Sequence, residues 1–434
     1  MVNIFFLIGN FILCLYYIYN SDYSIIAYIV FFQEIHLIPF NNIGYNAIGY
    51  IYYIIIAIIF LFRASKLKIS TKRLSYLASN NFIWSIGLIT FLIMVHTLLV
   101  GLKTDNAMIL VTRYSTQVVP VILYLVMVLN GYNFPSKIEQ ISNGILIYGI
   151  LLTVILLFTT DFVNISNYER GEIRDTIGMS PIAMTRIGCT MFITAVMIFL
   201  DNEKSRSNKV IIALFFSIIL IIFGTSRGPV FAMLIALLFY FIVYKDSHLL
   251  IIKSLKFIIP VGLFFLLLLL INADVMEIYT QRLQGLENVE DMPRYLRLLY
   301  VYEFFLNEFN VFSLFFLIGS GPAGFDYFFN LSYAHNFVIE LMFEYGFFGF
   351  LSAILFIGSS LYYSYKLIRV GIPNKYLFVP LILLYLLVAS MFSGDLIGWR
   401  NLFFMSIILL HMYFYRKKFF KLDMKVIVRS KAVG

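Results

Sequence analysis

A small group of polar residues stands at the head of one of the longest apolar runs in this sequence. In the stretch LSYAHNFVIELMFEYGFFGF (331–350), His335 and Asn336 precede the run and Glu340 and Glu344 lie within it. A histidine with a pKa of about 6.5 can accept a proton at physiological pH, which makes His335 a candidate general base. Asn336 is typical of a helix N-cap, and the two glutamates, four residues apart, share one helix face. Interfacial packing of His335 and pairing of the glutamates with arginines are the alternatives.

Arginines form the second group of residues with chemical potential. A guanidinium stays charged when partly desolvated and can hold a phosphate through two parallel hydrogen bonds. Neighbouring acids such as Glu172 offer the loop arginines ordinary ion pairs instead. Arg227 differs, because it stands in the short turn 224–228 (GTSRG) between two apolar runs and has almost no polar neighbours. The arginines that stand in polar loops or at the ends of apolar segments are Arg113, Arg170, Arg174, Arg227, Arg282, Arg294, Arg297 and Arg400.

The composition places these residues in a membrane protein. The 434 residues are 61% hydrophobic and 13% charged, whereas soluble domains contain about 45–50% apolar and about 25% charged residues. The net charge of +9 fits an excess of Lys and Arg in cytoplasmic loops, so nucleic acid is not expected as a partner. Cys14 and Cys189 lie in apolar segments and predict no disulfide. The N-terminus has no small-residue cleavage site and is expected to remain as a helix.

The apolar runs have the length of membrane-spanning helices. Residues 24–40 form a doubtful further run, which is interrupted by Gln33, Glu34 and His36 and suggests a re-entrant or interfacial piece. We therefore predict an all-α polytopic membrane protein, a single integral domain over 1–434 with about twelve spans, or thirteen if 24–40 crosses the membrane. The twelve runs occupy residues 3–19, 44–62, 82–101, 109–130, 141–160, 181–200, 209–223, 229–244, 255–273, 336–364, 377–393 and 400–415.

The distribution of basic residues predicts the orientation of these spans. The segment 63–73 (RASKLKISTKR) and the tail 416–434 are rich in Lys and Arg, so both are expected in the cytoplasm. Alternation from residue 44 then puts two long loops, 161–180 and 274–335, outside together with the turn 224–228. Twelve spans require a cytoplasmic N-terminus and thirteen an outside one. The arginines named above and His335 therefore gather at the outer ends of the helices.

Two further features bear on the chemistry of this outer end. No group of Asp, Glu and His has the spacing of a metal site, so neither a metal nor another cofactor is expected. The glycine-rich segment GSGPAGF (319–325) precedes His335. Such a segment can expose backbone N–H groups to a phosphate.

Four motifs follow one another along the chain: RDTIGMSP (174–181), TSRG (225–228), RYLRLLYVYEFF (294–305), and GSGPAGF with AHNFVIELMFEYGFFG (319–349). Together they resemble the O-antigen polymerase and O-antigen ligase superfamily of bacterial envelope enzymes, over residues 160–350. The resemblance implies a GT-C-like bundle in the bacterial inner membrane, with two periplasmic catalytic loops and an active site that faces the periplasm. It further implies inverting, metal-independent transfer of a glycan from undecaprenyl pyrophosphate.

The same resemblance assigns roles to individual residues. It implies catalytic roles for His335, Arg297 and Arg227. Arg294 could replace Arg297, because both precede aromatic-aliphatic runs, and Arg170 is a second choice beside Arg174. Arginines would stabilise the departing pyrophosphate, and His335 would accept the proton of the attacking hydroxyl. The residues expected to bind pyrophosphate or substrate are Arg174, Arg170, Arg294, Arg282, Asn336 and Glu344.

Three functions remain open on the sequence. A polymerase would move the growing glycan onto a lipid-linked repeat unit, and a ligase would move the finished glycan onto lipid A–core. The expected partners are the undecaprenyl-pyrophosphate-linked oligosaccharide, membrane lipid and a chain-length regulator protein. The third function is a flippase or other transporter of lipid-linked oligosaccharide. A transporter should line its midplane with polar groups, whereas the polar residues here gather at the outer ends.

Overall fold

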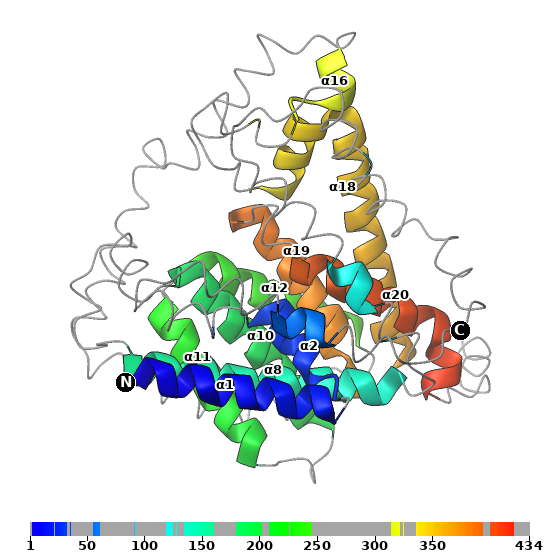
Figure 1. Ribbon diagram of the computed structural model, residues 1–434. Helices are drawn as coiled ribbons and strands as arrows, with labels where there is room; N and C mark the ends of the chain where they lie inside the picture. The colour runs from blue at the N-terminus through cyan, green and yellow to red at the C-terminus, as the bar shows by residue number, and fades with distance from the viewer. Residues whose placement is uncertain are drawn as a thin grey trace, which may run out of the picture.

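The computed structural model describes about half of the chain, and this part is helical throughout (Figure 1). The described residues are 2–20, 22–32, 35, 55–60, 91, 119–124, 127, 134–159, 179–201, 208–224, 226–244, 314–321, 324, 336–393 and 400–420. The helices are α1 (Val2–Tyr19), α2 (Ser24–Phe31), α8 (Phe134–Thr159), α10 (Pro181–Asp201), α11 (Asn208–Gly224), α12 (Arg227–Val243), α16 (Leu314–Ile318), α18 (Phe337–Val370), η5 (Asn374–Tyr376), α19 (Phe378–Ser393) and α20 (Arg400–Phe420).

Some of the described helices are long enough to span a membrane. Four of them are long and apolar enough to cross a bilayer: Phe134–Phe158, Pro181–Asp201, Phe337–Val370 and Asn374–Met391. The prediction of a helical membrane protein is therefore confirmed. The predicted set of twelve spans extends beyond the described residues, which include only Phe91 of the run 82–101 and nothing of 255–273.

Buried apolar helices form the centre of the bundle. All eight residues of α2 are buried, and so is every residue of α19 from Phe378 to Leu387. The outer helix α12 instead exposes Leu234, Leu238 and Ile242 on one face. This pattern fits a bundle whose periphery faces lipid, because lipid imposes no cost on exposed apolar side chains.

Polar side chains join the helices at one end of the bundle, which we call the Glu139 end. The Tyr240 hydroxyl at the end of α12 donates to Asn374 Oδ1 (3.3 Å), and Asn374 Nδ2 donates to the Leu200 carbonyl of α10 (3.2 Å). Lys209 Nζ, at the start of α11, donates to Asn143 Oδ1 of α8 (2.7 Å). The starts of α8, α11 and α19 therefore lie beside the ends of α10 and α12.

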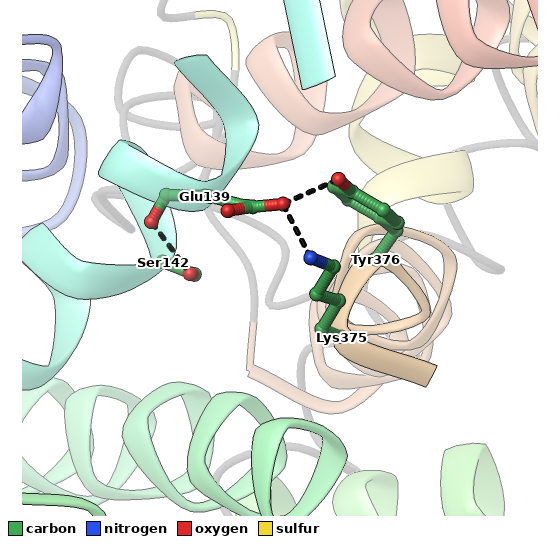
Figure 2. A network of polar contacts seen from close by, with 4 residues as sticks. All are labelled: Glu139, Ser142, Lys375 and Tyr376. Atoms are coloured by element: carbon green, nitrogen blue, oxygen red, sulfur yellow. Dashed lines mark hydrogen bonds and ion pairs between the residues drawn. The ribbon is translucent and has the colours of Figure 1, made fainter. Parts of the chain in front are cut away.

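Figure 2 shows the network that gives this end its name. Glu139 Oε1 lies 2.6 Å from Lys375 Nζ and accepts a hydrogen bond from the Tyr376 hydroxyl at 2.5 Å. The Ser142 hydroxyl donates to the Glu139 carbonyl (2.8 Å) one turn along α8. The network ties the first turns of α8 to η5 and thereby to the start of α19.

The opposite end, which we call the Arg227 end, is joined by separate contacts. The backbone N–H of Ser226 donates to Thr185 Oγ1 (3.3 Å), which connects α12 to α10. Asn336 Nδ2 donates to the Met391 carbonyl (3.1 Å) and connects α18 to α19. The helices α10 and α12 therefore both begin at this end.

The direction of α1 bears on the number of spans. Cys14 Sγ lies 3.6 Å from the Tyr148 hydroxyl, and farther along the chain Tyr23 N donates to Gln140 Oε1 (3.1 Å). The chain therefore runs toward the Glu139 end along α1, antiparallel to α8 (Figure 1). Twelve alternating spans would make α1 parallel to α8 and thirteen would make it antiparallel; most residues between α2 and α8 lie outside the described part.

The described part of the segment 24–40 enters the bundle beside α8. The Ser24 hydroxyl donates to the Gln140 carbonyl (2.8 Å), and the Phe32 ring lies 6.2 Å from the Tyr148 ring. This orientation makes α2 parallel to α8. The eight residues of α2 rise about 12 Å, so α2 alone reaches less than halfway across a bilayer of about 30 Å.

The prediction of one continuous span over 336–364 is wrong, because α18 folds back on itself at Gly346. Gly346 has φ 61° and ψ −149°, which no helix contains. The Phe337 and Phe356 rings lie 5.8 Å apart, and a Cβ on Gly349 would overlap the Leu341 carbonyl oxygen. The two limbs, 337–345 and 347–370, are therefore antiparallel, and we call the upper part (337–355) the α18 hairpin (Figure 1).

Candidate functional site

Arg227 is the first residue of α12, and the preceding turn is fixed by α10. Ser226 occupies the N-cap position with extended backbone and makes no side-chain cap. Its N–H donates to Thr185 Oγ1, and the Thr185 hydroxyl donates to the Pro181 carbonyl (3.0 Å). A Cβ on Gly224 would overlap Thr185 Oγ1. Gly224 thus permits close approach of α10.

The Arg227 end of α12 presents positive charge without a protein partner. The Arg227 side chain is partly buried, and its guanidinium makes no hydrogen bond or ion pair with any residue that the structure describes. Ser226 also provides no side-chain cap for the first N–H groups of α12. Free N–H groups and the helix dipole together favour an anion at this position.

Asn336 is the N-cap of α18, which confirms one of the two sequence interpretations. Its Oδ1 accepts from the N–H groups of Val338 (3.0 Å) and Ile339 (3.2 Å), while Nδ2 donates to Met391. Both polar atoms of the carboxamide are therefore engaged with protein. Asn336 fixes the position at which the chain enters α18 from His335.

Glu340 and Glu344 lie on the first limb of the α18 hairpin and are fully buried. As predicted from their spacing, they occupy consecutive turns of one helical limb. Burial of a carboxylate is costly unless it is neutralised or bonded. These two carboxyl groups lie between Asn336 and the turn at Gly346.

The glycine-rich segment closes the α18 hairpin. Gly319 and Gly321 have φ of 77° and 90°. The N–H groups of Ser320 and Gly321 donate to the carbonyls of Phe343 and Glu344 (both 2.9 Å). These carbonyls form the C-terminal, negative end of the first limb, which disfavours phosphate. The N–H groups of Ser320 and Gly321 are therefore bonded within the protein and do not face a phosphate.

Arg186 is a charged residue that our sequence analysis did not single out. It lies in the second turn of α10, and its carbonyl accepts a hydrogen bond from the Tyr385 hydroxyl (3.3 Å). Its guanidinium also interacts electrostatically with Tyr385. The available sequence signal was an ionisable residue inside an apolar run, which is itself a mark of a functional position.

Arg400 shows that an arginine at this end can be structural. Its Nη2 donates to the Val30 carbonyl (3.1 Å), in the last turn of α2. A cation at a helix C-terminus satisfies free carbonyls and complements the dipole. Arg400 is therefore bonded to the backbone of α2, whereas Arg227 has no partner among the described residues.

Arg227 and Asn336 lie at similar heights along the bundle. Tyr240 and Asn374 are hydrogen bonded at the Glu139 end. Heights along α12 and α19 are therefore measured from these two residues. Arg227 is about 20 Å above Tyr240, and Met391, which binds Asn336, is about 25 Å above Asn374, by the helical rise per residue. The difference is about one helical turn, so the two positions belong to one polar region.

The remaining candidate residues lie outside the described residues. They are His335, Arg170, Arg174, Arg282, Arg294 and Arg297. The same holds for the loop 161–180 before residue 179, for most of 274–335, and for the tail 416–434 beyond residue 420. Within the described part, no three His, Cys, Asp or Glu side chains are grouped so that they could hold a metal ion.

The chain matches no protein-family model and no curated protein. The resemblance of the four sequence motifs to the O-antigen polymerase and ligase superfamily therefore supports a proposed function only.

Proposed function

We propose that this protein is a bacterial inner-membrane polymerase of O-antigen or a related surface polysaccharide, with an active site that faces the periplasm. It transfers a growing glycan from undecaprenyl pyrophosphate to a lipid-linked repeat unit. The observation that carries the proposal is Arg227, a partly buried guanidinium at the uncapped start of α12 with no partner among the described residues. The motif resemblance of residues 160–350 supplies the reaction class.

The proposed reaction uses charge stabilisation and one proton transfer. A hydroxyl of the acceptor sugar attacks the anomeric carbon of the donor, and the bond from that carbon to the pyrophosphate oxygen breaks with inversion. His335 accepts the hydroxyl proton. Arg227 and the start of α12 stabilise the negative charge that develops on the departing pyrophosphate, with Arg174 and Arg297 as the proposed loop contributions.

The hydroxyl groups of the described spans favour an enzyme over a transporter. Thr153, Thr190 and Thr194 each donate to the carbonyl four residues earlier in their own helix. These hydroxyls are satisfied locally and do not line a polar path across the bundle. The contacts between helices that involve charged side chains instead gather near the Glu139 and Arg227 ends, which differs from the polar midplane of transporters.

The first test measures polymer synthesis by the purified protein in lipid vesicles with lipid-linked repeat units. Arg227→Lys and Arg227→Ala should both lower the rate by roughly 10²–10³, the usual effect of removing one charge-stabilising donor. Lysine cannot reproduce the bidentate fork of arginine. Arg369→Lys is the matched control, because Arg369 contacts Tyr365 near the opposite end, and it should leave the rate unchanged. A near-normal rate for Arg227→Lys would reduce the turn to a structural element.

The second test distinguishes a polymerase from a ligase in cells. A deletion strain that carries the His335→Ala variant should express the protein and make no long glycan chains. Loss of a polymerase leaves core capped with a single repeat, whereas loss of a ligase leaves uncapped core and accumulates lipid-linked polymer. A normal chain-length distribution in His335→Ala would refute the catalytic assignment of His335.

A further inference from the structure

The α18 hairpin, with α16 packed against its turn, stands beyond the helices α10, α12, α19 and α20 (Figure 1). The second limb of α18 runs parallel to α20, because the Phe356 and Phe403 rings lie 5.4 Å apart and the Tyr363 and Tyr413 rings 4.8 Å apart. Arg400 is therefore level with about residue 353 of α18. The turn at Gly346 is about seven residues, or roughly 10 Å, beyond that level.

The first limb of the hairpin gives a second, independent measure of how far the tip at Gly346 extends beyond the Arg227 end. Asn336 is held against Met391 at the end of α19. Nine residues separate it from Tyr345 at the hairpin turn, which corresponds to about 13 Å of helix. Both Asn336 and Arg400 thus lie roughly one-third of a hydrocarbon layer, itself about 30 Å thick, below the tip of the hairpin.

A belt of basic and aromatic residues marks one membrane boundary on the same helices. Lys366 lies over the Tyr362 ring (5.4 Å), and Arg416 lies over the Tyr413 ring (4.1 Å). Such pairs are typical of the bilayer interface, where aromatic rings and the stems of basic side chains are favoured.

The length of uncharged helix above this belt indicates where the other membrane boundary lies. On the second limb of α18, no charged residue occurs between the turn at Gly346 and Lys366, a length of about 30 Å that is close to the hydrocarbon thickness. On α20, the uncharged stretch between Arg400 and Arg416 is only about 22 Å long. If the belt lies at one interface, the hairpin tip reaches the other, and Arg400 stops short of it.

The surface of the hairpin fits contact with lipid. The second limb turns Gly349, Ser352 and Ala353 toward the protein, and Ser352 and Ala353 are fully buried. Its outer face is apolar and exposed, and this face continues toward the belt through Leu361. In water such a face would be unfavourable, whereas acyl chains cover it without cost. The exposed side chains of the hairpin are Phe347 (43%), Phe348 (38%), Phe350 (37%), Leu351 (38%), Ile354 (47%) and Leu355 (37%).

We infer that the α18 hairpin is embedded in the outer half of the bilayer, with acyl chains against its phenylalanine-rich face. The Arg227 end is then a recessed polar floor, roughly 10 Å beneath the membrane surface, and the hairpin is one of its walls. This inference rests on helix lengths, contacts and exposure and does not depend on the proposed function.

The test measures the depth of single tryptophans in vesicles. Trp84 and Trp399 are replaced by Phe, and one tryptophan is introduced as Phe350→Trp or Leu355→Trp. The inference places Phe350 about 6 Å and Leu355 about 13 Å from the hairpin tip along the helix. Phe350→Trp should lose most of its fluorescence to lipids brominated near the headgroup, and Leu355→Trp to lipids brominated near the chain ends. Neither should be quenched by aqueous iodide.

Two results would overturn the inference. Quenching of Phe350→Trp by iodide would place the hairpin in water, with the membrane surface near Arg400. Protection from both iodide and brominated lipid would show that protein covers this face. Leu234→Trp, on the exposed face of α12, is the lipid-facing control, and Phe347→Trp repeats the measurement if Phe350→Trp does not fold.

Discussion

Substitution of Gly346 by alanine tests the turn on which the hairpin depends. The backbone conformation at φ 61° and ψ −149° is essentially restricted to glycine, and another residue there costs about 1–3 kcal/mol. An added Cβ would also lie 2.5 Å from the Phe316 carbonyl oxygen, 2.6 Å from the Leu317 carbonyl carbon and 2.7 Å from Gly319 N. These are backbone atoms that no rotamer change can move, and overpacking adds about 1–3 kcal/mol.

The expected loss of stability for Gly346→Ala is therefore about 2–6 kcal/mol. A loss of about 3 kcal/mol lowers the ratio of folded to unfolded protein by roughly two orders of magnitude. The measurement is equilibrium unfolding in mixed micelles of a mild detergent and SDS, followed by circular dichroism. The variant should unfold at a clearly lower SDS fraction than the wild type.

Gly358→Ala is the matched control on the same helix. Gly358 lies in the regular second limb, and a Cβ there would meet no atom within 4 Å. Alanine is favoured over glycine in a helix interior by roughly 0.5–1 kcal/mol, so this variant should be neutral or slightly stabilised. Equal unfolding midpoints for Gly346→Ala, Gly358→Ala and the wild type would refute the folded-back arrangement of α18.

Two further substitutions test the ends of the bundle by the same unfolding measurement. Asn336→Ala removes an N-cap and the bond to Met391 and should cost about 1–2 kcal/mol, whereas Asn336→Asp should keep most of the cap; equal losses for the two would argue against capping. Glu139→Gln removes the charge opposite Lys375 and keeps an acceptor for Tyr376. Because both charged side chains are more than one-third exposed, the loss should stay below about 1 kcal/mol, and a larger loss would show that the network is a principal clamp.

Local features of the sequence were sufficient for several correct predictions. Hydropathy identified membrane helices, because a bilayer core accepts only long apolar segments with internally bonded backbone. The positions of basic clusters predict which loops face the cytoplasm, and this orientation stays a prediction. The capping role of Asn336 also followed from residue type and position, since an N-cap acts within its own first turn.

Features that depend on distant partners could not be obtained in this way. The fold-back at Gly346 needs the close approach of Gly319 and α16, so hydropathy alone merged both limbs into one span. Arg400 looked like Arg227 in the sequence, yet only Arg400 meets a helix C-terminus, at Val30. The direction of α1 likewise follows from its contacts with α8.

The sequence by itself thus determined that this protein is a helical membrane protein, and which types of residue are available at the Arg227 end. Each of these depends on the summed properties of neighbouring residues. Tertiary structure decided which charges are paired, which glycines turn the chain, and how the hairpin stands above Asn336. These depend on pairs of groups far apart in the chain, whose meeting is set by the packing of whole helices.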